Sequence, residues 1–158
     1  METVDRRAAR VLCVDADRRV LLLRWRDPVD GRSVWEPPGG GVNPDERPIE
    51  AARRELQEET GIPGDCVLDR RVAVRRDAVW AGRHYVGEEE FFLARIVDAR
   101  PLVRDGLSDE EAPILIEQAW VHWSRIQELT DRVEPPCLLD ILRRIDPSGP
   151  WNVKHASP

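Results

Sequence analysis

Residues 39–62, GGGVNPDERPIEAARRELQEETGI, constrain the fold of this chain more than any other segment. Three glycines open the segment, and a run compatible with a helix follows them. Pro48 suits the first turn of a helix because no intrahelical bond needs its missing N–H, and Gly61 followed by Pro63 ends the helix. The sequence therefore predicts a helix over Pro48–Thr60, preceded by a glycine loop.

This predicted helix has an apolar face beside an acidic one. At 3.6 residues per turn, Ile49, Ala52 and Leu56 form a stripe that can pack against a sheet. The neighbouring arc carries three carboxylates, those of Glu55, Glu58 and Glu59. Like charges one turn apart destabilise a helix by roughly 0.2–0.5 kcal/mol per pair. Such repulsion needs a compensating partner.

Two hypotheses account for the acidic arc. In the first, the arc is exposed to solvent, and Arg54 pairs with Glu50 and Glu58 at helical spacing. In the second, the carboxylates bind a divalent cation such as Mg²⁺, which takes oxygen ligands and shares them with substrate phosphates. The glycines favour the second hypothesis, because glycine lets the backbone approach a ligand closely. A cation would turn repulsion into coordination.

The glycine loop and the helix resemble the Nudix box: Gly, five residues, Glu, seven residues, then Arg-Glu-aliphatic-x-Glu-Glu-x-Gly-aliphatic. Every fixed position is matched, by Gly40, Glu46, Arg54, Glu55, Leu56, Glu58, Glu59, Gly61 and Ile62. Asn43 stands where many relatives carry an acid, but this position lies outside the strict pattern. The resemblance implies an α/β fold, a Nudix-type α/β/α sandwich with a mixed β-sheet.

The resemblance also implies a chemistry. Nudix enzymes use Mg²⁺ or Mn²⁺ to hydrolyse a nucleoside diphosphate linked to another group, with water attacking phosphorus. Carried over position by position, the metal ligands would be the carboxylates of Glu55, Glu58 and Glu59 and the Gly40 carbonyl. Arg54, paired to Glu46, would orient the carboxylates. The predicted catalytic residues within the box are thus Arg54, Glu58 and Glu59.

Further candidates lie outside the box. In the family, a later glutamate sometimes supplies another ligand or the general base, and Glu90 is the candidate here. On a strand, Glu90 shares a face with Phe92, whereas Glu89 lies on the opposite face. The acidic segment DGLSDEEA, residues 105–112, holds weaker candidates, namely Asp109, Glu110 and Glu111.

Arginines and tryptophans are secondary candidates. Strand arginines could hold phosphate, at Arg24, Arg26, Arg70, Arg71, Arg75 and Arg76. Aromatic side chains could stack a base, at Trp35, Trp80, Trp120 and Trp123. Solvent exposure for the arginines and core packing for the tryptophans are the commoner uses of such residues.

The rest of the chain is typical of one α/β domain. β-Rich runs predict strands at residues 8–14, 20–25, 34–36, 66–80, 88–97 and 114–123. Further helices are predicted near residues 124–129 and 136–145. This order indicates a mixed sheet covered by helices. We expect a single Nudix domain over residues 1–145 and an extended or loose tail over residues 146–158.

Composition narrows the partners and the location. A net charge of −6 argues against a dedicated nucleic-acid binder. The resemblance to the Nudix family implies a small nucleoside diphosphate derivative as the substrate. No run approaches the roughly 18 apolar residues of a membrane span, and METVDRRAAR lacks a signal-peptide core, so we expect a cytoplasmic protein. The three cysteines are expected to be reduced thiols. A homodimer is left open.

Three alternative functions are compatible with this fold. RNA 5′-end pyrophosphohydrolysis is disfavoured by the acidic net charge. A diphosphate isomerase is disfavoured by the intact box, because that enzyme departs from the strict pattern, and a nucleotide sensor would more readily have lost a catalytic glutamate. The sequence does not select the substrate, because the downstream proline and tyrosine that mark two groups within the family have no counterpart at the expected positions.

Overall fold

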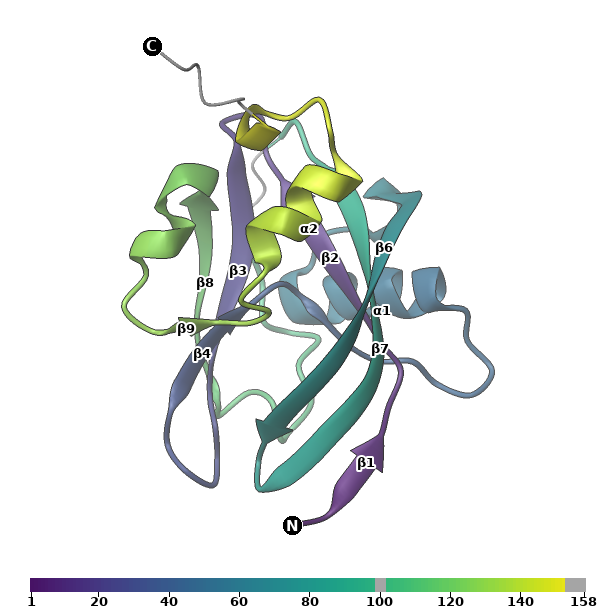
Figure 1. Ribbon diagram of the computed structural model, residues 1–158, viewed down its shortest axis with the longest axis vertical. Helices are drawn as coiled ribbons and strands as arrows, with labels where there is room; N and C mark the ends of the chain where they lie inside the picture. Colours follow the sequence, from purple (N-terminus) through teal and green to yellow (C-terminus); the bar gives the residue numbers. More distant parts are fainter. Residues whose placement is uncertain (99–101, 153–158) are drawn as a thin grey trace.

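The computed structural model describes residues 1–98 and 102–152, which form a mixed β-sheet with helices on its two faces (Figure 1). The strands of this part are β1 Thr3–Asp5, β2 Ala8–Val14, β3 Arg19–Arg26, β4 Ser33–Glu36, β5 Gly39–Gly41, β6 Val67–Trp80, β7 Arg83–Arg95, β8 Leu115–His122 and β9 Arg132–Val133. The helices are α1 Pro48–Thr60 and α2 Leu138–Ile145, with short 3₁₀ helices η1 Gly64–Cys66, η2 Trp123–Glu128 and η3 Pro150–Asn152.

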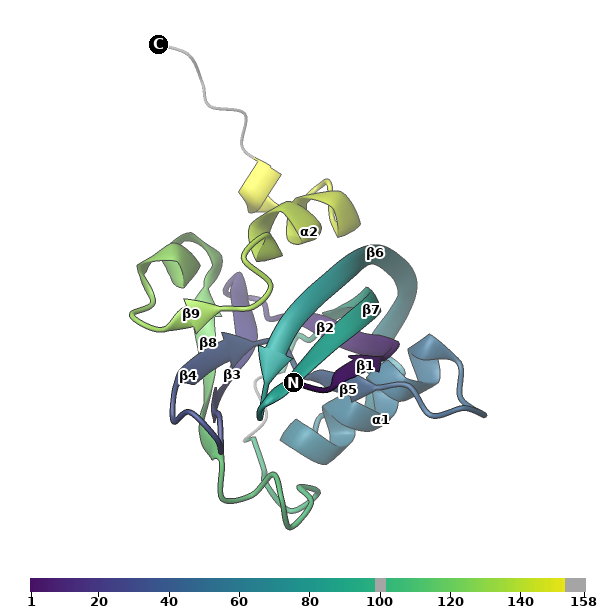
Figure 2. The ribbon, with the colours of Figure 1, turned by 60° about the horizontal axis from the view of Figure 1, so that its bottom comes forward.

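The sheet has the order β1-β7-β2-β3-β4-β9, and β5, β6 and β8 pair with β2, β7 and β3 respectively. Strand β2 is parallel to β7 and antiparallel to β3, so the predicted mixed sheet is confirmed. Figure 2 shows α1 below the sheet and α2 above it. The predicted sandwich of helix, sheet and helix is therefore present.

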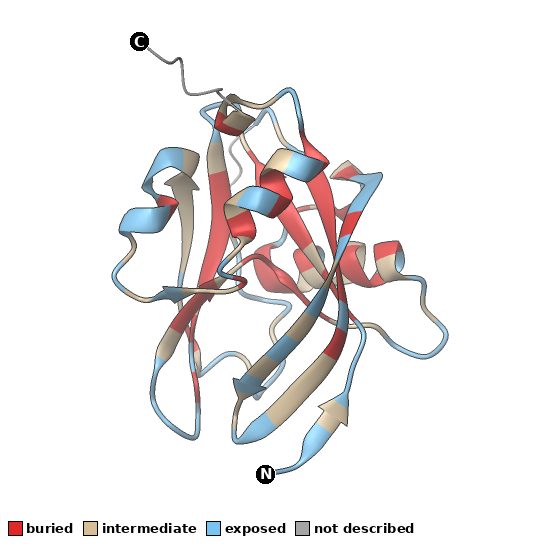
Figure 3. Ribbon diagram, in the orientation of Figure 1, coloured by how far each residue is buried: buried red, intermediate tan, exposed pale blue. Residues whose placement is uncertain are grey.

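Strand β2 lies at the centre because its side chains can be buried on both faces (Figure 3). Ala9, Val11 and Cys13 belong to the apolar cluster that includes the buried residues of α1. Leu12 and Val14 belong to the second cluster, which includes the buried residues of α2. One strand thus contributes to both halves of the core, and the sheet between them is held rigidly.

Helix α1 begins and ends where the sequence predicts. Glu50 accepts a hydrogen bond from the Arg47 N–H at 3.0 Å, which partly satisfies the first turn. Gly61 adopts a left-handed conformation (φ 78°), and its N–H donates to the Gln57 carbonyl at 2.9 Å. The predicted stripe of Ile49, Ala52 and Leu56 is buried against the sheet.

The glycine segment is a short strand rather than the predicted loop. Residues Gly39–Gly41 pair antiparallel with Ala8, Ala9 and Arg10 of β2. The absence of side chains is what allows this pairing close to α1, because a Cβ on Gly40 would lie 2.5 Å from a carboxylate oxygen of Glu55. The segment is therefore part of the sheet, and the loop that leads to α1 begins directly after it.

Strands β6 and β7 form a long hairpin that extends beyond the rest of the sheet. Its two-residue turn, Ala81 and Gly82, has positive φ at both positions (51° and 76°), which matches the right-handed twist of a hairpin. Strand β7 consequently begins at Arg83, earlier than predicted. In Figure 1 the hairpin and the β4–β9 pair lie on opposite sides of the lower half of the molecule.

Residues 146–152 pack on α2, in contrast to the loose tail predicted from residue 146. Trp151 is only 4% exposed, and its Nε1–H donates to the Asp146 carbonyl at 2.9 Å. Arg143 of α2 donates to the Trp151 carbonyl, also at 2.9 Å. A large apolar side chain inside a Pro, Gly and Ser-rich segment is what keeps it in place. Residues 153–158 of the predicted tail lie outside the described residues. Among the described helices, none has the length and apolar character needed to span a membrane.

Candidate active site

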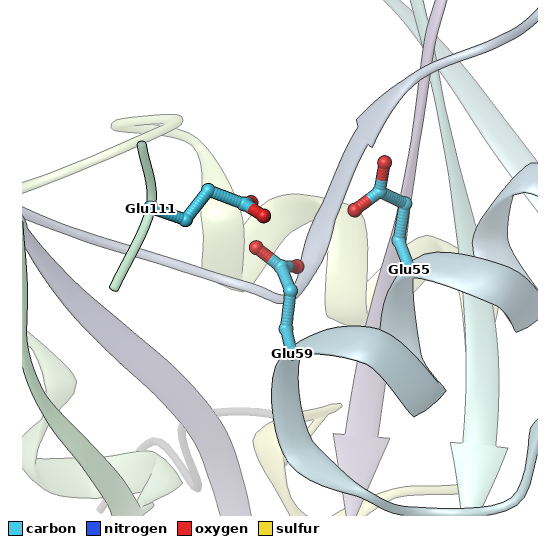
Figure 4. A group of neighbouring side chains, drawn as sticks. All are labelled: Glu55, Glu59 and Glu111. Carbon is cyan, nitrogen blue, oxygen red and sulfur yellow. The ribbon is translucent and has the colours of Figure 1, made fainter. Parts of the chain in front are cut away.

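Three carboxylates from two segments converge beside helix α1 (Figure 4). Glu55 and Glu59 lie one turn apart on α1, and Glu111 reaches them from the segment before β8. One oxygen of each side chain lies within 4.8 Å of the others. Grouped carboxylate oxygens are the ligands that Mg²⁺ and Mn²⁺ prefer. The residues present therefore fit a divalent cation.

Glu59 is the most deeply buried member of this carboxylate group, with 2% of its surface exposed. Its Oε1 accepts a hydrogen bond from the Gly39 N–H at 2.7 Å, so strand β5 fixes its direction. Burial raises the pKa of Glu59 well above its ordinary value and Glu55 raises it further, against the lowering by Gly39 and Arg10. An ionised Glu59 is thus unfavourable until a cation balances it.

Glu55 lies between the carboxylate group and Arg54. Burial raises its pKa, and the neighbouring Glu58 and Glu111 add to that rise, while Arg54 lowers it. Arg54 Nη1 donates to Glu55 Oε1 at 3.0 Å. This single cation does not balance the charge of three carboxylates, so the group stays negative. Gly40 lies directly against this carboxylate, and any side chain there would displace it.

Arg54 and Glu46 form the predicted pair. Arg54 donates from Nε and from Nη2 to the two oxygens of Glu46, both at 2.8 Å. This paired geometry makes a strong charge-assisted contact, and through it Arg54 lowers the pKa of Glu46 to about 2. Arg54 Nη2 also donates to the Gly41 carbonyl at 3.1 Å. The guanidinium therefore ties α1 to strand β5 at the site.

Glu58 lies with Arg54 rather than with the carboxylate group. Its Oε2 is 3.3 Å from Arg54 Nη1, and its side chain is 42% exposed. Glu50, which the solvent-exposed hypothesis pairs with Arg54, pairs with Arg47 instead. Of the three predicted carboxylate ligands, the structure brings Glu55 and Glu59 together and leaves Glu58 on the more exposed side of Arg54.

Glu111 completes the group, although the sequence ranks it among the weaker candidates. Its Oε1 accepts from the Ser108 N–H at 3.0 Å, and its own N–H donates to Ser108 Oγ at 3.2 Å. The loop can approach α1 because Gly106 has no side chain. A Cβ there would lie 2.5 Å from the Glu58 carbonyl oxygen. Glycine and serine within an acidic run are a signal for such a turn, but the signal does not distinguish Glu111 from the acids preceding it.

The carboxylate group lines a cavity of about 840 Å³ that lies between the β6–β7 hairpin and the β4–β9 pair. This volume falls in the range of roughly 300–1,000 Å³ that is typical of small-molecule sites. At the outer end, the Asp27 carboxylate accepts hydrogen bonds from the N–H groups of Val29 at 2.8 Å and Ala81 at 2.9 Å. Asp27 thereby joins the loop after β3 to the turn of the hairpin.

Arg10 of β2 lines the same cavity and connects its two walls. It pairs with Glu89 of β7 and, at 3.3 Å, with Glu36 of β4. Burial lowers the pKa of Arg10, but Glu36 and Glu89 together raise it above its ordinary value, whereas burial raises the pKa of Glu36. The sequence did not identify Arg10, because one arginine within AARVLCV is typical of the solvent face of a strand.

Glu90 is not brought into the carboxylate group. It is 8% exposed, its Oε1 is 3.5 Å from Arg71 Nη1, and it is absent from the residues that line the cavity. Glu89 lies on the opposite face of β7 and does line the cavity. The geometry therefore favours Glu89 over Glu90 as the acid of β7 that faces a ligand.

Only some of the secondary candidates line the cavity. Of the six predicted strand arginines, all of them in the described part of the chain, Arg76 alone lines the cavity. Arg24 pairs with Asp131 and lies over the ring of Trp35 at 5.8 Å. Trp80 lines the cavity, whereas Trp35 is buried in the core.

Comparison with known families and curated proteins agrees with this geometry. Residues 4–140 match the NUDIX domain. The chain is 33% identical over 113 residues to an RNA pyrophosphohydrolase of Erythrobacter litoralis and 32% identical over 118 residues to one of Cereibacter sphaeroides. These matches cover 64% and 65% of this chain and 68% and 65% of those proteins. A shorter match, 62% identical over 34 residues, covers 20% of the Bartonella clarridgeiae protein of the same name and 22% of this chain.

Solved structures share the fold. A MutT protein from Methanosarcina mazei Go1 superposes with a TM-score of 0.61 at 24% identity, covering 98% of this chain and 99% of that one. A Nudix hydrolase from Nitrosomonas europaea gives 0.62 at 20% identity, covering 89% and 87%. A MutT Nudix hydrolase from Burkholderia pseudomallei gives 0.50 at 31% identity, covering 75% and 84%.

Proposed function

This chain belongs to the NUDIX family, which its residues 4–140 match, and we propose that it hydrolyses the diphosphate bridge of a nucleoside diphosphate derivative with a divalent cation. It is accordingly an enzyme, a Nudix hydrolase. The observation that carries the proposal is the group of Glu55, Glu59 and Glu111 at the wall of a cavity large enough for a nucleotide.

Glu55, Glu59 and Glu111 would hold Mg²⁺ or Mn²⁺. Gly40 and Glu58 stay proposed ligands, because the Nudix pattern assigns them that role and both lie within the same short segment as Glu55. When bound, the cation neutralises phosphate charge and lowers the pKa of a coordinated water. Arg54 would orient the carboxylates, because it contacts Glu46, Glu55 and Glu58 at once.

The reaction forms a bond between a water oxygen and one phosphorus of the bridge and breaks the bond from that phosphorus to the bridging oxygen. The leaving phosphate departs with the bridging oxygen, and the proton of the attacking water passes to a carboxylate. Glu58 and Glu59 are our candidates for that acceptor. Gly39 fixes Glu59 through its N–H, so this carboxylate presents a constant direction to the bridge.

The charge of the cavity supports a strict dependence on the cation. Its lining carries five arginines and nine aspartates or glutamates. Several of these arginines are already paired with acids, as Arg10 is with Glu36 and Glu89. Since a phosphate chain is itself negative, it would be repelled from this wall without a bound cation.

A second candidate is hydrolysis of the 5′ end of RNA. It is favoured by the curated relatives, because the proteins of Erythrobacter litoralis and Cereibacter sphaeroides are RNA pyrophosphohydrolases and are 33% and 32% identical to this chain over about two thirds of its length. The net charge of −6 weighs against tight binding of a long polyanion. Both candidates use the same carboxylate group.

One panel of substrates tests both candidates. The native protein with Mg²⁺ is incubated with nucleoside triphosphates, nucleotide sugars, dinucleoside polyphosphates and RNA carrying a 5′ triphosphate, and the products are identified by mass. We expect cleavage within a diphosphate bridge that stops when the cation is chelated. Glu59→Gln serves as the inactive control. Turnover that survives full chelation, or no turnover across the panel, would contradict the proposal.

A further inference from the structure

Arg76 is anchored across the cavity by an acid from the opposite wall. It lies on β6, and its Nη2 pairs with Glu134, which directly follows β9. Glu134 pairs in turn with Arg132, and its N–H donates to the Trp35 carbonyl at 2.8 Å. The side chains of Arg76 and Glu134 are only 15% and 14% exposed. The guanidinium is therefore held in one orientation.

The other terminal nitrogen of Arg76 is left without a partner by the residues that the structure describes. Its Nη1 is buried and has no hydrogen-bond partner among the described residues. Buried donors in folded proteins almost always find an acceptor, so an unpaired guanidinium N–H needs an explanation. Because Arg76 lines the cavity, a ligand that carries an acceptor would supply the missing bond.

The position of Arg76 decides which part of a ligand it can meet. The carboxylate group lies on α1 and on the segment before β8, where strand β5 contacts it. Arg76 lies instead on the β6–β7 hairpin, together with Trp80 and Tyr85, two aromatic residues that line the same cavity. A nucleotide held by its phosphates at the carboxylate group could place its flat base against such aromatic side chains. Arg76 therefore faces the portion of the substrate beyond the phosphates.

We propose that Arg76, held by Glu134, recognises the nucleobase of the substrate through a keto oxygen, and so favours guanine or uracil over adenine; this rests on the proposed function. Arginine donates well to the O6 and N7 acceptors of guanine. Adenine carries an amino group in place of O6, and this group is itself a donor that an arginine N–H cannot bond. Sites built to bond one group reject analogues that lack it.

Binding of nucleoside monophosphates tests this inference, because these probes have no diphosphate bridge to hydrolyse. Affinities of GMP, UMP and AMP in Mg²⁺ are measured by calorimetry for the native protein, Arg76→Gln and Arg75→Gln. Arg75 is the matched control, since it is the preceding residue of β6, is exposed and lies on the other face. We expect the native protein to prefer GMP and UMP to AMP by roughly ten- to a hundred-fold, Arg76→Gln to lose that preference and Arg75→Gln to keep it.

Arg76→Lys is the control for a folding defect. Lysine keeps the positive charge opposite Glu134 but lacks the planar, forked guanidinium of arginine. This variant should keep the native rise of melting temperature with Mn²⁺ and yet lose the keto preference. Equal affinity of the native protein for the three probes, or a preference that survives in Arg76→Gln, would overturn the inference. So would an equal loss for all three probes, which would mark Arg76 as a phosphate contact. None of these results depends on turnover, so hydrolysis in the substrate panel separately decides the proposed function.

Discussion

Two groups of charges lie side by side along helix α1, each completed by a residue from another segment, and they are balanced differently. In the first, Arg54 satisfies both oxygens of Glu46 and lowers the pKa of that carboxyl to about 2. In the second, Glu59 lies beside Glu55 and Glu111 with its pKa raised by burial and by its neighbour. The first group is complete as it stands, whereas the second lacks positive charge.

This contrast separates a structural task from a functional one. The pair of Arg54 and Glu46 fixes α1 against strand β5, since the same guanidinium reaches the Gly41 carbonyl. The carboxylate group of Glu55, Glu59 and Glu111 has no comparable cation among the described residues, apart from the single contact of Arg54 with Glu55. A folded protein keeps such an unfavourable arrangement where a ligand relieves it. The comparison therefore predicts different responses to mutation, metal and pH.

The largest effect should come from Glu59→Gln. The amide oxygen can still accept from the Gly39 N–H, so the fold is kept while one charge at the cation site is removed. We expect kcat at saturating Mg²⁺ to fall by more than the roughly 10- to 100-fold that is typical for a residue holding a ligand in place. Circular dichroism should be unchanged. Near-native kcat in this variant would show that Glu59 does not take part in the reaction.

Glu58→Gln and Glu46→Gln decide to which group Glu58 belongs. Glu58 is 3.3 Å from Arg54, a looser contact than the 2.8 Å bonds to Glu46, so its carboxylate can turn toward a cation. We expect Glu58→Gln to lose kcat as severely as Glu59→Gln, and Glu46→Gln to lose only about 10- to 100-fold. Steady-state kinetics at saturating Mg²⁺ provides the comparison. Equal, mild losses in both variants would place Glu58 with the structural pair.

Cation binding should stabilise the protein measurably. At a hundred times its dissociation constant, a cation that binds only the folded state adds about 2.7 kcal/mol to the free energy of unfolding. For a chain of this size that corresponds to a rise in melting temperature of roughly 5–10 °C. Differential scanning fluorimetry with Mg²⁺, Mn²⁺ and chelator measures it, and Glu46→Gln, which keeps the carboxylate group, should respond like the native protein. A flat response would contradict a preformed cation site.

The two groups should also respond to pH with opposite signs. Glu59, with its raised pKa, binds a proton more tightly when folded, so its contribution to stability is complete below pH 4.5 and is lost as pH rises through the folded pKa. Glu46, with its lowered pKa, contributes above pH 4.5 and loses this contribution as pH falls toward 2. Denaturant unfolding in chelator measures both. Relative to Glu59→Gln the native protein should weaken with rising pH, and relative to Glu46→Gln it should weaken with falling pH; the reverse signs would refute the contrast.

Local signals account for what the sequence could predict. Pro48, Gly61 and the stripe of apolar residues lie within the helix itself, so the bounds of α1 and the burial beside Glu59 follow from neighbouring residues alone. The spacing of the Nudix box likewise identifies Glu55 and Glu59. Each of these features depends only on residues that are close together in the sequence.

Long-range placement accounts for what the sequence could not predict. Alternation along β7 puts Glu89 and Glu90 on opposite faces, but the face that lines the cavity depends on where the hairpin of β6 and β7 meets the other wall. Glu111 reaches the site only because its loop returns to α1 at Gly106. The inward position of Arg10 likewise depends on acids from β4 and β7, which are remote in sequence.

The smallest effect, and the one most specific to the contrast, concerns Glu55→Gln without metal. Glu55 lies between the two groups, and its pKa is raised by burial and by Glu58 and Glu111 even though Arg54 lowers it. Its charge is therefore a net cost to the folded protein, and removing it should stabilise by about half a kcal/mol, the scale of a like-charge pair on a helix.

In chelator, Glu55→Gln should accordingly melt about 1–2 °C above the native protein, while the amide oxygen still accepts from Arg54. The same variant should gain less than the native protein from Mg²⁺, because one ligand has become neutral. Glu50→Gln is the control, since Glu50 pairs with Arg47 away from the carboxylate group. If Arg54 already neutralised the acidic arc, as the solvent-exposed hypothesis requires, Glu55→Gln would melt lower than the native protein in chelator. That result would mean that the repulsion on α1 is compensated within the protein and that no cation is needed to relieve it.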